Sequence, residues 1–157
     1  MKRCVAILVV LVAAGVGGNA LAAGSKGAAI PKPEDFMQRV VRLTVAGRHA
    51  EAWYLLHPAH QKLAPRSRFV RCRAEPAGTP PSRVVSAEFE GKRYERIDTA
   101  LIPQHTATAV RLKVAVATGT KREPAEVTVR AVWTGKRWAW ILPASNIVAF
   151  RAGKCPS

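Results

Sequence analysis

The clearest structural signal in the chain is the stretch VTVRAVWTGKRWAWIL, residues 127–142. Apolar and polar residues alternate on both sides of Gly135 and Lys136, which predicts an antiparallel β-hairpin with a two-residue turn. Closing the hairpin between Thr134 and Arg137 fixes its register. That register pairs Trp133 with Trp138, Ala131 with Trp140 and Val129 with Leu142. The six side chains then share one face, which we expect to be buried; a tryptophan platform that stacks on sugars or bases is the alternative.

Alternation also predicts strands before this hairpin. In residues 106–118, Val110, Leu112, Val114 and Val116 alternate with polar or small residues, which is typical of a strand with one buried face. Residues 84–90 and 94–102 are two further predicted strands, and residues 147–150 are predicted to form a last short strand. We therefore expect an antiparallel sheet.

The residues that precede the sheet have helical periodicity. A first helix is expected to begin at Pro33, which suits a first turn, and to end at Gly47. Its apolar residues recur at helical spacing: Phe36, Met37, Val40, Val41 and Leu43. A second helix is expected over residues 48–57, ended by Pro58, and a third short helix over residues 65–72.

Helices followed by a run of strands indicate an α+β fold rather than a parallel α/β fold. We expect a single domain over residues 33–155, with the N-terminal helices packed on a curved antiparallel sheet. A chain of 157 residues is long enough to bury one core and too short for several domains.

Three segments of the chain form a pattern that is seen in a known superfamily. They are GRHAEAWYLLHP at residues 47–58, the short helix at residues 65–72, and WTGKRWAW at residues 133–140. This pattern resembles the nuclear transport factor 2-like superfamily, and is most similar to its small bacterial secreted or lipoprotein-type members. The resemblance covers roughly residues 33–150 and implies a cone-like fold with a pocket between helices and sheet. It implies no single activity, because the superfamily includes isomerases and dehydratases as well as non-catalytic binding and assembly domains.

The first 22 residues have the pattern of a secretory signal peptide. A cationic start is followed by an aliphatic stretch and by small residues at positions 20 and 22. The apolar stretch stops at Asn19, short of the roughly 20 residues that a membrane-spanning helix needs. We expect cleavage after Ala22, a flexible lead over residues 23–32, and a secreted or extracytoplasmic location.

Two cysteines, Cys72 and Cys155, remain after such a cleavage. An even pair in an oxidising compartment predicts a disulfide, here between the middle of the chain and its C-terminal end. Two free thiols or a metal site are the alternatives. The cysteines lack the CxxC spacing that is typical of zinc sites.

Basic residues outnumber acidic ones by 25 to 10, a net charge of +15. Residues 1–22 hold two of the basic residues and no acidic one, so the other 135 residues carry +13. Seven clustered residues are candidates for anion binding: Arg66, Arg68, Arg71, Arg73, Lys92, Arg93 and Arg96. A basic surface attracts anions at long range, although such charge can also serve solubility alone. Secretion would exclude intracellular nucleic acid and leave anionic polymers or lipid surfaces.

The resemblance also implies that polar residues in the pocket would form the functional site. The candidates are Tyr54, His57, Tyr94, Asp98, His105 and Trp140. Enzymes with this fold use an aspartate, alone or with a histidine, as a general base beside tyrosines, and Asp98 would take that role. Its surroundings, YERIDTALI, are equally typical of a solvated strand. No catalytic residue is therefore assigned.

No metal or cofactor site is predicted. His57 and His60 flank Pro58, which breaks the helix between them, and no third ligand lies near them in the sequence. A capping role for a helix-ending histidine is the preferred interpretation. The sequence contains no nucleophile elbow, HExxH motif, P-loop or dinucleotide-binding motif.

Three classes of function agree with these observations. The sequence favours a non-enzymatic domain that binds a small ligand or a protein partner at the cell envelope. The second class is a basic surface that binds an anionic polymer or a membrane surface. The third is a small isomerase-like or dehydratase-like enzyme.

Overall fold

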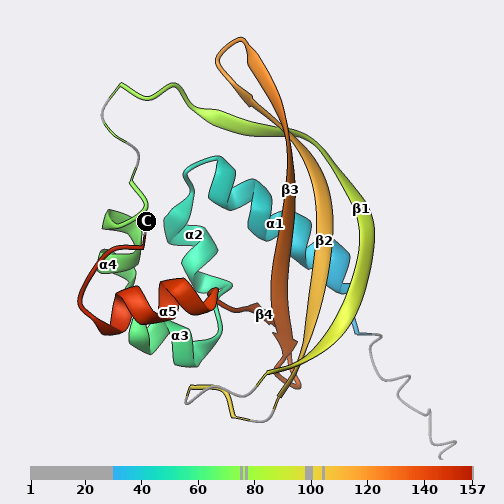
Figure 1. Ribbon diagram of the computed structural model, residues 1–157, viewed down its shortest axis with the longest axis vertical. Coiled ribbons are helices and arrows are strands. Elements are labelled where there is room, and N and C mark those ends of the chain that lie inside the picture. Colours follow the sequence, from blue (N-terminus) through green and yellow to red (C-terminus); the bar gives the residue numbers. More distant parts are fainter. Residues whose placement is uncertain (1–29, 75, 77, 98–100, 104, 157) are drawn as a thin grey trace, which may run out of the picture.

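The computed structural model describes residues 30–74, 76, 78–97, 101–103 and 105–156. The predicted signal peptide, most of the predicted lead and Asp98 lie outside these residues. The described part is an α+β protein, as predicted, and consists of five helices and one four-stranded antiparallel sheet (Figure 1). None of the helices in this part combines the length and the apolar character that crossing a membrane requires.

The strands lie in the sheet in chain order. They are β1 (Ser82–Ile97), β2 (His105–Thr118), β3 (Lys121–Trp133) and β4 (Trp138–Trp140). The closing hairpin has the predicted register, with Trp133 opposite Trp138 and Ala131 opposite Trp140. At its turn the Thr134 N–H donates to the carbonyl of Arg137. Gly135 has a φ of +86°, a left-handed conformation that glycine adopts without strain.

The first strand, β1, is continuous, so the prediction of two strands on either side of Gly91 is wrong. β-Bulges at residues 84–86 and 89–91 absorb the irregular spacing, and pairing with β2 continues past them. The strand ends at Ile97 rather than at Ile102. Ile102 is instead buried in a small cluster at that end of the sheet.

The last strand, β4, is shorter than predicted. It ends at Trp140, so the predicted pairing of Val129 with Leu142 does not form. The backbone of residues 55–57 pairs with Trp140 instead, and the His57 N–H donates to the Trp140 carbonyl over 2.9 Å. This pairing covers the free edge of β4.

The same pairing explains why the predicted second helix is wrong in its extent. Leu56 forms a β-bridge to Trp140 and the backbone of His57 is extended, so α2 (His49–Tyr54) is short and a separate helix, α3 (Pro58–Leu63), follows. Pro58, which was predicted to end a helix, occupies the first turn of α3. The His57 ring caps α3, since its Nδ1 accepts the Ala59 N–H over 3.3 Å.

Two other helices lie where they were predicted, and one is new. The predicted helices are α1 (Pro33–Val45) and α4 (Arg66–Arg71). The new helix is α5 (Ala144–Arg151), so the prediction of a strand at residues 147–150 is wrong. Ile147 and Phe150 are buried in one cluster, and helical spacing places them on one face, whereas a strand would point them to opposite faces.

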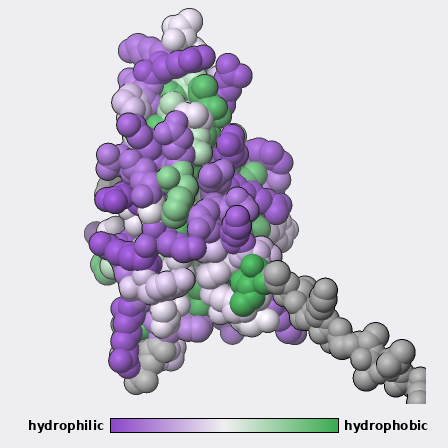
Figure 2. All heavy atoms as spheres, turned by 90° about the vertical axis from the view of Figure 1, so that its right-hand side faces the viewer, coloured by the Kyte–Doolittle hydropathy of each residue, from purple (hydrophilic) through white to green (hydrophobic). Residues whose placement is uncertain are grey.

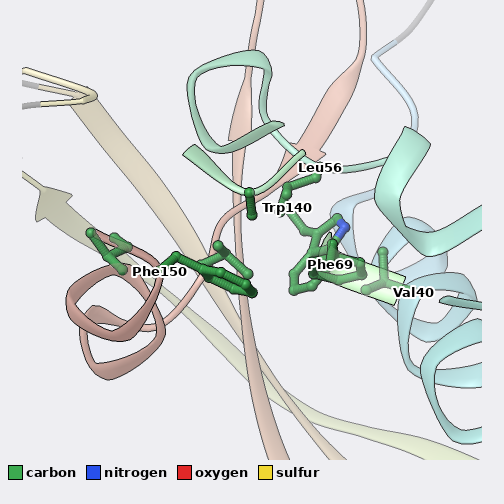
Figure 3. Close-up of a cluster of buried hydrophobic side chains, with 8 residues drawn as sticks. Val40, Leu56, Phe69, Trp140 and Phe150 are labelled. Carbon is green, nitrogen blue, oxygen red and sulfur yellow. The ribbon is translucent and has the colours of Figure 1, made fainter. Parts of the chain in front are cut away.

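The core lies on the face of the sheet that packs against α1. Helix α1 contacts all four strands, and we call this face the inner face and the opposite one the outer face. One cluster lies beneath α1: Met37, Val41, Val110, Leu112, Val114 and Ala131. A second cluster joins the other helices to the sheet: Val40, Leu56, Ala64, Phe69, Trp140, Leu142, Ile147 and Phe150 (Figure 3). The predicted disulfide is present and ties Cys72, after α4, to Cys155, after α5.

Candidate functional site

An apolar cavity opens between α1 and the edge of β3. Only residues 131–133 of β3 pair with β4, so the preceding part of β3 has a strand, β2, on one side only. The cavity has a volume of about 280 Å³. Its apolar walls come mainly from α1, β3 and β4: Val40, Val41, Val45, Val127, Val129 and Trp140. The short β4 therefore leaves an opening into the inner side of the sheet.

A second, more polar hollow adjoins this cavity. It has a volume of about 370 Å³ and is lined in part by His49 and Cys72. Thr44, Arg73 and Asn146 line both spaces. These three residues come from α1, from the end of α4 and from the first turn of α5. The junction between the apolar cavity and the polar hollow thus carries a hydroxyl, a guanidinium and an amide.

The guanidinium of Arg73 is the most unusual group at this junction. Its carbon lies 5.0 Å from the centre of the Phe69 ring, in a cation–π contact. Its Nε is buried and has no hydrogen-bond partner. Burial lowers the pKa of Arg73, because desolvation disfavours the charged form, yet an arginine stays charged in proteins. A positive charge is therefore held at the apolar cavity.

No acidic side chain among the described residues balances this charge. Arg73 takes part in none of the ion pairs between described residues, and its Nε has no hydrogen-bond partner. Arg130 also lines the cavity at the edge of β3, but strand alternation points its side chain to the outer face, opposite to Val129 and Ala131, and its Nε donates to the Glu95 carboxylate over 2.6 Å. Among the described cavity residues, Arg73 alone offers an uncompensated charge.

Trp140 is the one predicted pocket residue that lines this cavity. It is 6% exposed, and its Nε1 donates to the Ala52 carbonyl over 2.9 Å, which fixes the ring. Tyr54 and Tyr94 are 56% and 72% exposed and do not line the cavity. Asp98 lies outside the described residues. The structure therefore does not bring the predicted pocket residues together.

The two remaining predicted pocket residues, His57 and His105, lie near each other but away from the cavity. Burial lowers the pKa of His57, and the charges of His105 and Arg137 lower it further. Neighbouring His60 is buried, and its Nδ1 accepts the Leu142 N–H over 3.0 Å. Burial lowers the pKa of His60 to about 4, with a smaller effect of His57. His60 is thus neutral at pH 7 and joins α3 to the chain after β4.

Among the described residues, no group of three histidine, cysteine or acidic side chains is arranged to hold a metal ion. His57 and His60 instead accept hydrogen bonds from backbone N–H groups: His57 caps α3, and His60 accepts from Leu142.

The predicted anion-binding arginines of α4 and its end have separate environments. Arg66 lies over the ring of Tyr54, at 5.4 Å. Arg68 lies over Phe150 and donates to the Lys154 carbonyl. Arg71 is exposed, and Arg73 reaches the cavity. The cluster in the sequence is therefore not one cationic patch, because successive helical positions point to different neighbours.

The predicted basic residues of β1 are mostly paired with acids. Lys92 binds Glu34 of α1 over 2.8 Å, and Arg93 binds Glu95 over 2.6 Å. Arg96 is exposed. A shallow hollow of about 190 Å³ lies here, lined by Gly91, Lys92, Arg93, Ala109, Arg111 and Thr128. Viewed from the β1 side, the surface is mostly hydrophilic with small separate apolar patches (Figure 2).

Sequence reasoning selected Arg73 for its charge but did not place it in a pocket. Its position directly after Cys72 was a usable signal, because a disulfide that ties two distant segments also fixes the neighbouring side chain. Thr44 had no signal in the sequence, and Asn146 lay beside a segment that was predicted as a strand.

The comparison with known proteins gives no assignment. No protein-family model matches the chain, and no curated protein matches it.

Proposed function

We propose that this protein is a non-enzymatic binding domain of the cell envelope, and that the cavity between α1 and β3 holds a small ligand. The observation that carries this proposal is the cavity itself, with apolar walls and a few convergent polar groups, which is the usual composition of a ligand site. Its volume of about 280 Å³ lies just below the roughly 300–1,000 Å³ that is typical of small-molecule pockets. The ligand is accordingly small.

Binding rather than catalysis is proposed because of the residues that line the cavity. The described lining residues include neither a carboxylate nor an imidazole, the groups that most often transfer protons in enzymes. Hydroxyl, amide and guanidinium groups orient a ligand without taking its proton at neutral pH.

The proposal extends to the fold family and to the location. A sheet that packs one face against a long helix, with a cavity between them, supports a fold of the nuclear transport factor 2-like type. The Cys72–Cys155 disulfide and the predicted signal peptide support an extracytoplasmic location, since such bridges persist in oxidising compartments.

Binding of the neutral dye N-phenyl-1-naphthylamine, measured by fluorescence, tests the cavity. We expect saturable binding that weakens about tenfold or more in Val129→Phe, because the larger ring fills the cavity. Val148→Phe is the matched control, since Val148 is 66% exposed on α5. Val45→Phe fills the cavity from the half-buried end of α1 if Val129→Phe does not fold. Absent dye binding, or equal binding by all variants, would refute the proposal.

A second candidate function is capture of an anionic polymer by the basic surface around β1. The hollow between Arg93 and Arg111 supports it, although both arginines already pair with acids, Glu95 and Glu90. Polyphosphate binding that falls steeply with salt, weakens in Arg111→Gln and is unchanged in Val129→Phe would favour this candidate. Dye binding without polyphosphate binding would exclude it.

A further inference from the structure

We infer that the ligand is a small organic carboxylate, with its charged group on the Arg73 guanidinium and its apolar part in the cavity. This inference rests on the proposed function and names the chemical class of the ligand.

The first argument is the unbalanced charge of Arg73. A buried charge that lacks a partner is costly, so buried arginines normally pair with an acid. Here Nε is buried without a partner, and no described carboxylate lies against the guanidinium. A ligand carboxylate supplies two acceptor oxygens at the spacing of the guanidinium donors. The bound anion would complete the ion pair that the described chain leaves open.

The second argument is that the guanidinium is held in place before any ligand arrives. The Phe69 ring lies beneath it, and Phe69 is itself 1% exposed in the core. The preceding residue, Cys72, is bonded to Cys155. A group whose position is fixed in advance loses little entropy on binding.

The third argument is the position of Arg73 at the junction of the two spaces. On one side lies the apolar cavity, with Val41 and Val129 in its walls; on the other lies the polar hollow. Asn146 lines both spaces, and its amide N–H group can donate a further hydrogen bond to a carboxylate. An amphipathic anion matches both sides, whereas an inorganic anion leaves the apolar walls unused.

The fourth argument is the charge of the whole chain. A net charge of +15, or +13 without residues 1–22, attracts small anions from a distance. The general attraction brings anions to the surface, and Arg73 selects those that carry an apolar part. The basic composition and the apolar cavity thus serve one ligand.

Calorimetric titration of the protein with octanoate and with octan-1-ol tests the inference. The two compounds share the same alkyl chain and differ in the charged group. We expect octanoate to bind about tenfold or more tightly than octan-1-ol, because the alcohol offers the guanidinium one neutral acceptor oxygen in place of two charged ones. Arg73→Gln should remove this preference while leaving octan-1-ol binding in place.

Arg71→Gln is the matched control, because Arg71 is exposed two residues away and should keep the full preference. Arg73→Lys retains the charge without the two-pronged donor geometry and should give an intermediate preference. If Arg73→Gln does not fold, the Lys variant alone decides the result. The preferences of folded variants are compared at one salt concentration.

The outcomes separate this inference from the proposed function. If the dye binds in the cavity but octanoate and octan-1-ol bind equally well, the anion inference is overturned and the cavity function stands. If the wild type binds octanoate more tightly than octan-1-ol but Arg71→Gln and Arg73→Gln reduce this preference equally, Arg73 is not the site of the carboxylate. The inference is then overturned too. If the dye and both compounds fail to bind, the proposed function fails.

Discussion

Arginines on the two sides of the sheet differ in whether they pair with an acidic side chain. On the outer face, the Glu95 carboxylate accepts hydrogen bonds from both Arg130 and Arg93, each over 2.6 Å. These donors, Arg130 first, hold the pKa of Glu95 below its usual value. On the inner side, Arg73 is half-buried, its Nε is fully buried, and it has no such acid among the described residues. Most of the basic residues lie at the surface, whereas Arg73, which has no acidic partner among the described residues, lies at the cavity.

This difference shows that clustered charge in a sequence does not by itself locate a site. An exposed ion pair contributes little free energy because water and salt screen both charges. A buried charge without a partner has a large desolvation cost, which a bound anion can offset. Four experiments test this contrast, from the largest expected effect to the smallest.

The largest effect is expected from removing the bridge beside Arg73. We expect the double variant Cys72→Ser with Cys155→Ser to lose about 4 kcal/mol of unfolding free energy, because the bridge closes a long loop of the unfolded chain. Urea unfolding of the variant and of the oxidised wild type measures the difference. The octanoate preference should fall as well, since Arg73 loses its anchor. A loss below about 1 kcal/mol would contradict the assigned role of the bridge.

The second effect is a loss of stability in acid that originates at His60. The unfolded histidine binds a proton below pH 6.5, whereas the folded one does so only below about pH 4. Stability is therefore complete above pH 6.5 and falls as the pH drops toward 4, by up to about 3 kcal/mol. Glu95 on the outer face acts in a lower window, because its lowered pKa costs stability only as the pH falls below its unfolded value of 4.5.

His60→Asn separates these two windows. The Asn Oδ1 can replace Nδ1 as the acceptor of the Leu142 N–H, but it does not titrate. We expect chemical unfolding measured between pH 6.5 and 4 to show a much flatter profile for this variant. An unchanged profile would mean that other groups, such as His57, cause the acid loss.

The third effect is a gain in unfolding free energy, whereas the first two are losses. Arg73→Met should raise the unfolding free energy of the ligand-free protein by about 1 kcal/mol, because it removes a half-buried charge whose Nε has no partner and keeps an apolar side chain over Phe69. Thermal unfolding with and without octanoate measures this change. Octanoate should stabilise the wild type more than the variant, which keeps only the binding of the alkyl chain. Destabilisation of the ligand-free variant would contradict the unpaired state of Arg73.

The smallest effect is expected on the outer face. Glu95→Gln removes the carboxylate that both Arg93 and Arg130 bind, yet we expect a loss of only about 0.5 kcal/mol, which shrinks further in high salt. Unfolding in low and high salt measures it. A loss that is large and independent of salt would show that the outer-face pairs are as important as the inner-face site.

Local patterns predicted a large part of the fold. The hairpin register, the long first helix and the Cys72–Cys155 pairing each depend on one strong signal: alternation around a glycine turn, helical spacing, and an even cysteine pair. The errors lie where a contact between distant segments decides the structure. The helix predicted over residues 48–57 stops early because the backbone of residues 55–57 pairs with Trp140, and residues 147–150 are helical because two of them pack in one cluster.

The candidate site was predicted only in part, for the same reason. Trp140 was selected as a pocket residue and Arg73 as an anion-binding residue, but nothing local placed them beside one cavity. Tyr54 and Tyr94 carry polar groups suited to a pocket, yet their positions in α2 and β1 turn them toward solvent.

The sequence by itself determined the class of fold, the hairpin register, the bridged cysteines and the strong positive charge, because each of these depends on residue type and short-range spacing. Only the tertiary structure decided which arginine places a buried, unpaired Nε at the cavity. Burial depends on how α1, α4, α5 and the free edge of β3 come together, and these segments are far apart in the chain. The free energy of a charge depends on its surroundings, which residue spacing does not specify.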